Sequence, residues 1–245
     1  MTARELYQAG KLDEAVLALN AELRNNPDDA KRRTFLFELL CFAGNFDRAE
    51  KQLDILAQGS PEALTGALMY RAALAAERGR REMFEKKEYP TTGSDVHEPA
   101  GTLNGTAFQA VSDSDPRIGP RLEVFAAGQY MWIPFQHIAS LEMQPPKRLR
   151  DLLWAPVVLR TGPSFRGVEL GEVLVPTLSP FSFKHADDAV RLGRVSVWEE
   201  QDGEEIPFGL KSLLIDGEEF PILELRRLEI AGQEEEVPQE HASAH

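Results

Sequence analysis

The sequence predicts an α+β protein, with paired helices in its N-terminal part followed by a β-rich, antiparallel, small barrel-like domain. The first observation is a repeat: residues 10–15 read Gly-Lys-Leu-Asp-Glu-Ala, and 34 residues later the chain reads Gly-Asn-Phe-Asp-Arg-Ala. A period near 34 is typical of tetratricopeptide helix-turn-helix units. The second observation is that apolar spacing changes from helical to alternating beyond residue 105. We therefore divide the chain into a tetratricopeptide-like helical domain at 1–88, a linker at 89–105, a β-rich domain at 106–232 and a disordered tail at 233–245.

The repeat contains its own turn residues. Gly10 and Gly44 permit the left-handed conformation in which helices commonly end. Pro27 and Pro61, which share the same offset, stop one helix and open the next. The expected helices are Thr2–Ala9, Leu12 to the Asn26-Pro27-Asp28 turn, Asp29–Ala43, Phe46–Ala57 and Pro61–Arg78.

The fifth helix starts a third repeat whose Gly79 comes one residue late. The strongly charged stretch at 80–88 follows it, and a short helical array needs a polar outer face where it ends. We therefore expect the array to stop near Lys87.

The β-rich part begins with a predicted hairpin, in which the Ala127-Gly128 turn joins strands at 122–126 and 129–133. A short strand is expected at 140–143. Two β-rich runs at 154–159 and 173–178 each contain a proline, Pro156 or Pro176, which places the interruptions at edges or bends. The last strands, at 194–199, 205–215 and 220–230, are separated by two Asp-Gly turns and predict one antiparallel meander.

Composition excludes several classes of partner. The formal net charge of −13 argues against a nucleic-acid partner, because phosphate binding needs clustered positive charge. No apolar run approaches the roughly 18 residues that span a bilayer, and Arg4 and Glu5 stand where a secretory signal would begin its apolar core. The single Cys41 lies among apolar residues and predicts a buried thiol in a reducing cytoplasm.

The sequence predicts no catalytic, cofactor or metal site. Residues 162–166 begin like a nucleophile elbow but have Arg166 in place of the second glycine. No glycine-rich loop is followed by the Lys-Ser or Lys-Thr pair that cradles phosphates. The chain is therefore not expected to be an enzyme.

Residues 113–117, Asp-Ser-Asp-Pro-Arg, are the one cluster that supports an alternative function. Asp113, Asp115 and Arg117 could form a small-molecule or metal site, or an acid and base pair in an enzyme. The favoured interpretation is a turn with Arg117 as ion-pair partner, because Asp and Ser before Pro form turns through side-chain hydrogen bonds.

Lys147-Arg148-Leu149-Arg150 is the one basic cluster in an acidic chain. Such a cluster is usually a solvated face, and the alternative is that it docks an acidic partner.

Three motifs carry a family resemblance. They are Asp-Ser-Asp-Pro-Arg-Ile-Gly-Pro-Arg-Leu-Glu-Val at 113–124, Tyr-Met-Trp-Ile-Pro-Phe at 130–135 and Asp-Leu-Leu-Trp-Ala-Pro at 151–156. Together with the N-terminal helical repeat, the chain up to about Ile230 resembles the ImpE family, also called the TagJ or SciE-type accessory proteins of bacterial type VI secretion.

The resemblance implies a cytoplasmic, non-enzymatic adaptor of this contractile virulence apparatus. It implies binding of the small sheath subunit to the N-terminal helical segment, and an indirect link to the AAA+ ATPase that dismantles contracted sheath. It transfers no catalytic residue and no cofactor. A soluble assembly chaperone is a third hypothesis.

A short helical array presents a groove lined by the first helix of each repeat, and such grooves bind amphipathic helices. We expect Phe42 and Leu68 to supply apolar contact there, and Lys31 and Glu38 to orient the ligand. The alternative is that Phe42 and Leu68 close the core of a repeat pair. The predicted partner-binding residues are Lys31, Thr34, Glu38, Phe42, Thr65 and Leu68.

Overall fold

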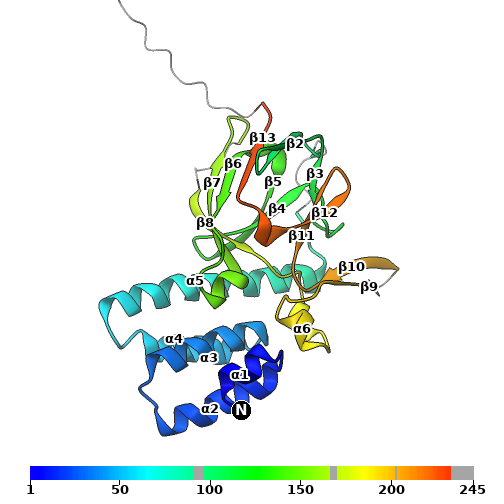
Figure 1. The fold of residues 1–245 in the computed structure, drawn as a ribbon. Helices are drawn as coiled ribbons and strands as arrows, with labels where there is room; N and C mark the ends of the chain where they lie inside the picture. The colour runs from blue at the N-terminus through cyan, green and yellow to red at the C-terminus, as the bar shows by residue number, and fades with distance from the viewer. Residues whose placement is uncertain (91–95, 166–169, 202, 233–245) are drawn as a thin grey trace, which may run out of the picture.

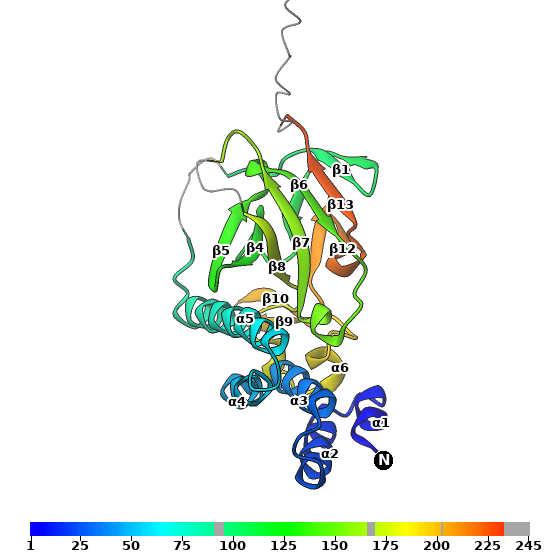
Figure 2. The ribbon, with the colours of Figure 1, turned by 90° about the vertical axis from the view of Figure 1, so that its left-hand side faces the viewer.

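The computed structural model describes residues 1–90, 96–165, 170–201 and 203–232, and the predicted tail at 233–245 lies outside these ranges. Helices occupy one half of the molecule and strands the other (Figure 1), and the long helix α5 lies between them. Figure 2 shows α5 beneath the strands, with the remaining long helices on its other side.

Paired helices form the N-terminal part, as predicted. Their bounds are α1 (Ala3–Gln8), α2 (Leu12–Asn25), α3 (Ala30–Phe42), α4 (Phe46–Leu56) and α5 (Pro61–Lys86). Thr2 caps α1 through a capping box with Glu5. Gly10 and Gly44 have φ angles of 77° and 67°, the left-handed conformation that the repeat requires of them.

The fifth helix is longer than the predicted Pro61–Arg78, whereas the helical array stops near Lys87, as expected. α5 continues through Gly79 to Lys86 as one helix of 26 residues, and the next regular elements are strands. Its last turns expose Glu82, Glu85 and Lys86 on one side and bury Arg80 and Phe84, each 3% exposed, on the other. Burial against the strands stabilises the helix beyond the glycine, where local propensity alone predicts an end.

The β-rich part contains thirteen strands and short helical segments among the residues described. The strands are β1 (Gly101–Leu103), β2 (Thr106–Phe108), β3 (Val111–Asp113), β4 (Arg121–Ala126), β5 (Gln129–Pro134), β6 (Ile138–Met143), β7 (Trp154–Thr161), β8 (Gly171–Pro176), β9 (Val197–Gln201), β10 (Glu204–Phe208), β11 (Ser212–Ile215), β12 (Glu218–Pro221) and β13 (Arg227–Ile230). The helical segments are η1 (Phe135–His137), η2 (Leu149–Leu152), η3 (Ser182–Lys184), α6 (Asp188–Arg191) and η4 (Ile222–Glu224). Because β1 begins at Gly101, the predicted linker at 89–105 extends too far.

The main sheet has eight strands in the order β2-β1-β13-β6-β7-β8-β4-β5, and every pair is antiparallel. Among the described strands, β2 and β5 do not pair with each other, so the sheet does not close into the barrel that the sequence suggested. Pro156 lies beyond the last residue pair between β6 and β7, and Pro176 ends β8. Both prolines therefore lie near a strand end, as predicted, although each stays in register between β7 and β8, opposite Leu174 and Trp154 respectively.

The predicted C-terminal meander is wrong as a single sheet. β9 pairs with β10, β11 pairs with β12 and β3, and β13 lies in the main sheet. Asp216 and Gly217 do form the predicted hairpin turn, with φ angles of 52° and 85°. This turn was predictable because it is local, whereas the choice of strand partner depends on distant residues. Asp202, in the other predicted Asp-Gly turn, lies outside the described residues.

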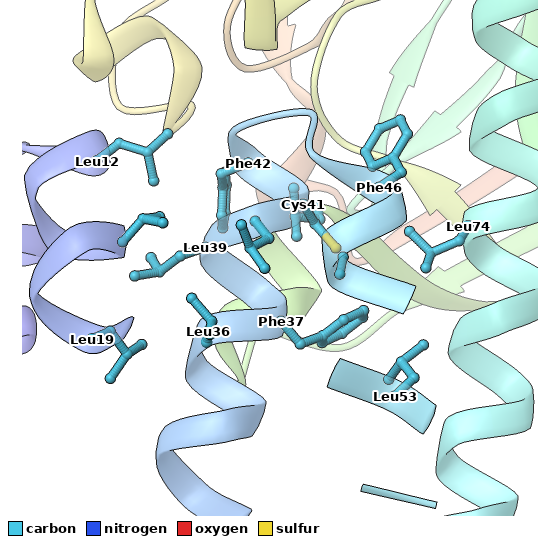
Figure 3. Packing of buried hydrophobic residues seen from close by; sticks show 14 of the residues in the cluster. Leu12, Leu19, Leu36, Phe37, Leu39, Cys41, Phe42, Phe46, Leu53 and Leu74 are labelled. Carbon is cyan, nitrogen blue, oxygen red and sulfur yellow. The ribbon is translucent and has the colours of Figure 1, made fainter. Parts of the chain in front are cut away.

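Two large apolar cores hold the molecule together. One lies within the sheet region, and the other fills the space between the helices (Figure 3). The helical core also contains Phe125, Leu153 and Trp154 from the β-rich part, so it continues across the boundary between the two parts. Among the residues described, no helix has both the length and the apolarity needed to cross a membrane.

Candidate functional site

The segment Lys147–Trp154, which we call the insert segment, lies against the helices. Arg150 approaches Glu38 on α3, with 3.6 Å between Nη1 and Oε1, and its guanidinium lies 4.6 Å from the ring centroid of Tyr70 on α5. Trp154 stacks on Tyr70 with ring centroids 6.4 Å apart. The β-rich part therefore fills part of the helical face that the sequence predicted to be an open groove.

The local sequence explains the shape of the insert segment. Asp151 accepts hydrogen bonds from the backbone nitrogens of Lys147 and Arg148, both at 2.9 Å, which closes the turn that opens η2. Arg150 is half-buried and paired, so the basic cluster is not wholly the solvated face that its composition favours.

A groove of about 480 Å³ remains open between α1, α3 and the insert segment, and we call it the α1/α3 groove. It is lined by Arg4, Tyr7, Gln8, Lys31, Thr34, Phe35, Glu38, Pro146, Lys147, Arg148, Leu149 and Leu152.

The apolar surface of this groove is built from α1, α3 and η2. Tyr7 meets Phe35 edge to face, with ring centroids 5.7 Å apart, and Leu149 and Leu152 face them from η2. The guanidinium of Arg4 lies 5.7 Å from the centroid of the Phe35 ring. This combination of aromatic and aliphatic surface suits the apolar side of a peptide.

The charge of the α1/α3 groove is opposite to that of the chain as a whole. Four cationic side chains line it, and Glu38 is its one acidic lining residue among those described. Burial raises the pKa of Glu38 to about 7, against the attraction of Arg150. The groove is therefore a cationic surface on a protein of net charge −13.

The structure brings three of the six predicted residues together: Lys31, Thr34 and Glu38 all line the α1/α3 groove. Phe42 is 1% exposed within the helical core, which matches the packing alternative. Thr65 is exposed and Leu68 is 55% exposed, and both lie on α5 outside this groove.

A buried ionic cluster joins α5 to the β-rich part, and sequence analysis missed it. The guanidinium of Arg80 donates to both carboxylate oxygens of Glu123, at 2.6 and 2.8 Å. Lys211 pairs with Glu123 and, at 2.5 Å, with Asp113. The Tyr130 hydroxyl also donates to Glu123.

The pKa values of the two carboxyl groups of this cluster are shifted in opposite directions. Burial alone would raise the pKa of Glu123, but Arg80 and Lys211 hold it at about 2. Burial raises the pKa of Asp113 to about 6, although Lys211 opposes the shift. Glu123 is therefore the permanent anion of the cluster.

The Asp113, Asp115 and Arg117 cluster has the geometry of the favoured interpretation, a turn. Asp115 accepts from the backbone nitrogen and the guanidinium of Arg117, at 3.0 and 2.8 Å. Asp113 accepts from the Asp115 nitrogen at 2.9 Å and pairs with Lys211. Within the described ranges no group of three or more His, Cys, Asp or Glu side chains could hold a metal ion.

Comparisons with known proteins identify relatives along almost the whole chain. The profile of the ImpE protein family matches residues 105–229. The type VI secretion system accessory component TagJ of Pseudomonas aeruginosa is 32% identical over 262 aligned residues, covering 94% of this chain and 91% of TagJ. The crystal structure of protein VPA1032 from Vibrio parahaemolyticus superposes with a TM-score of 0.81 at 26% identity, covering 93% of this chain and 97% of that one. By both the family profile and the full-length relative, the chain belongs to the ImpE family, which the three motifs of its β-rich part had indicated.

Proposed function

We propose that this protein is a non-enzymatic adaptor of a type VI secretion system, acting in the bacterial cytoplasm. It binds the N-terminal helix of the small contractile-sheath subunit and thereby modulates sheath assembly or the disassembly driven by the AAA+ ATPase. The proposal is supported by the similarity to TagJ, whose name describes an accessory component of that system.

The observation that carries the binding mode is the α1/α3 groove. It combines an apolar surface around Phe35 and Leu149 with cationic side chains at its rim. An amphipathic helix laid in such a groove would bury its apolar side and direct carboxylates toward Arg4 and Lys31.

Pull-down of the small sheath subunit, with and without its first helix, tests the proposal. The intact subunit should bind and the truncated one should not, and equal capture of both forms would overturn the proposal.

A charge-reversal pair locates the binding surface. Arg4→Glu with Lys31→Glu should weaken capture of the intact subunit by about tenfold or more, because each lost charged contact contributes about 1.5–3 kcal/mol. Both side chains are exposed, so the variant should fold. Arg160→Glu with Arg227→Glu, which makes the same charge change on strands β7 and β13, is the matched control.

A further inference from the structure

A second groove lies between α2 and α4, with α3 as its floor, and we call it the α2/α4 groove. Its volume is about 540 Å³, within the usual range of binding pockets. It is lined by Leu17, Asn20, Ala21, Leu23, Arg24, Arg33, Leu36, Arg48 and Gln52.

The two grooves lie on opposite sides of α3. Successive residues of an α-helix are rotated by about 100°, so Lys31 and Glu38 share one side of α3 while Arg33 and Leu36 lie on the other. Lys31 and Glu38 line the α1/α3 groove, and Arg33 and Leu36 line the α2/α4 groove. Two ligands could therefore be bound at the same time.

Both walls of the α2/α4 groove present aliphatic side chains to solvent. Leu17 on α2 is 71% exposed and Ile55 on α4 is 45% exposed. Ile55 follows Arg48 and Gln52 at helical spacing and so lies on the groove side of α4. Leu23 and Leu36 also line the groove and are buried, at 7% and 2% exposed.

Three arginines and no acidic residue line this groove among the residues described. Arg33 donates to the Gln52 side chain at 2.8 Å and to the carbonyl oxygen of Pro27. Over the described ranges, the guanidinium groups of Arg24 and Arg48 form no ion pair. Their donors are therefore available to an external carboxylate.

The absence of acid from the groove has a structural cause on α4. Its carboxylates face α5, where Asp47 and Glu50 pair with Arg78 at 3.0 and 2.7 Å and Asp54 pairs with Arg71 at 2.6 Å. The three carboxylates that pair with α5 therefore lie on one side of α4, and Arg48 lies on the other.

We propose that the α2/α4 groove is a second docking site, which takes an acidic amphipathic helix of another protein. The apolar row of that helix packs between Leu17 and Ile55, and its flanking carboxylates pair with Arg24, Arg33 and Arg48. This inference does not rest on the function proposed for the α1/α3 groove. It makes the helical part a scaffold that joins two partners through the two sides of α3.

The test uses the full chain and a fluorescein-labelled synthetic peptide of eighteen residues, with Leu at helical spacing, Glu on both flanks and Ala elsewhere. A second peptide carries Lys in place of every Glu. Fluorescence anisotropy should show binding of the acidic peptide, and the Lys peptide should bind at least about tenfold more weakly. Equal binding of the two peptides, or no binding of either, would overturn the proposal.

Two charge-reversal variants decide which groove is used. Because the α1/α3 groove suits an acidic amphipathic peptide as well, the Arg4→Glu with Lys31→Glu variant serves as the starting protein, and it should still bind the acidic peptide. Adding Arg24→Glu with Arg48→Glu to it should weaken that binding by about tenfold or more. Loss of all binding in the starting variant would assign the peptide to the α1/α3 groove and refute the second site. Far-UV circular dichroism checks that each variant is folded, and Leu17→Asp provides an independent probe of the apolar wall.

Discussion

At the scale of single residues, the clearest feature is how the protein handles buried charge. Glu123 is fully buried, and it is stable as an anion because Arg80 and Lys211 both contact it. A buried ion pair adds little stability compared with an apolar alternative, but removing one partner leaves the others desolvated and uncompensated. The cluster therefore specifies how α5 meets β4 more than it adds net stability.

Glu123→Gln should destabilise the fold by about 3–5 kcal/mol, because Arg80 and Lys211 would remain buried with their main counter-charge removed. Urea unfolding followed by circular dichroism measures this loss. Glu142→Gln is the control, since Glu142 pairs with Arg227 at 3.4 Å on the exposed surface and should cost less than about 1 kcal/mol. Similar losses for the two variants would contradict the assigned role of the cluster.

The raised pKa of Glu38 predicts that the stability of the fold depends on pH. Its pKa rises on folding from 4.5 to about 7, so between these values the folded state holds a proton that the unfolded state has lost. Its contribution to the free energy of unfolding is therefore complete below about pH 4.5 and is lost as pH rises through about 7.

Between pH 5 and pH 8 the wild-type protein should lose up to about 3 kcal/mol more stability than Glu38→Gln does. Asp113, whose pKa is also raised, is common to both proteins and cancels in the comparison. Urea titrations at the two pH values measure the difference. Parallel losses in the two proteins would show that Glu38 ionises normally.

At the scale of elements, the two repeat turns have the same backbone but different surroundings. A Cβ on Gly44 would lie 2.3 Å from Cδ2 of Phe183, whereas one on Gly10 would come no closer than 3.5 Å to the Arg194 guanidinium. Phe183 also packs on Phe46, with ring centroids 6.1 Å apart. The turn at Gly44 therefore ends α3 and also packs against Phe183 of η3 in the β-rich part.

Gly44→Ala should therefore cost more stability than Gly10→Ala. Both variants put an L-residue at positive φ, which costs about 1–2 kcal/mol, and Gly44→Ala adds overpacking of about 1–3 kcal/mol. The midpoints of urea unfolding compare them directly. Equal losses would mean that Phe183 moves aside without cost.

At the scale of the whole molecule, the helical core does not end at the predicted domain boundary. Trp154 packs on Phe37 from α3 and Tyr70 from α5, and its indole nitrogen donates to Glu77 at 3.1 Å. The helices and strands thus share a core that contains buried side chains from both. They should unfold together.

Trp154→Ala should lower the free energy of unfolding by about 3–5 kcal/mol while leaving a single transition. Far-UV circular dichroism reports mainly on the helices, and fluorescence of the remaining Trp132 and Trp198 reports on the strands. The two probes should give coincident curves in the wild-type protein and in the variant. Separate midpoints in the wild-type protein would mean that the shared core does not couple the two parts.

Much of this architecture could be predicted from the sequence, because it depends on residues close together in the chain. The 34-residue offset located the helix ends at Gly10 and Gly44, and Asp216-Gly217 located a hairpin turn, because backbone preference at a turn depends on the residues in it. The family was identified in a different way, from motifs that resemble those of known proteins and not from physical chemistry. For the candidate groove, the helical spacing of Lys31, Thr34 and Glu38 was enough to place these three residues on one face.

The sequence alone therefore determined the helical hairpins, the α+β class, the turns at Gly10, Gly44 and Asp216-Gly217, and the family. Only the tertiary structure decided that α5 continues past Gly79, that the last strands belong to three sheets, and that the insert segment occupies part of the predicted groove. The physical reason is that these outcomes depend on pairs far apart in the chain, such as Arg80 with Glu123 and Glu38 with Arg150. Burial in the folded protein sets the environment of each of these charged groups. The residues next to a charged group in the sequence do not indicate which distant side chain it will contact.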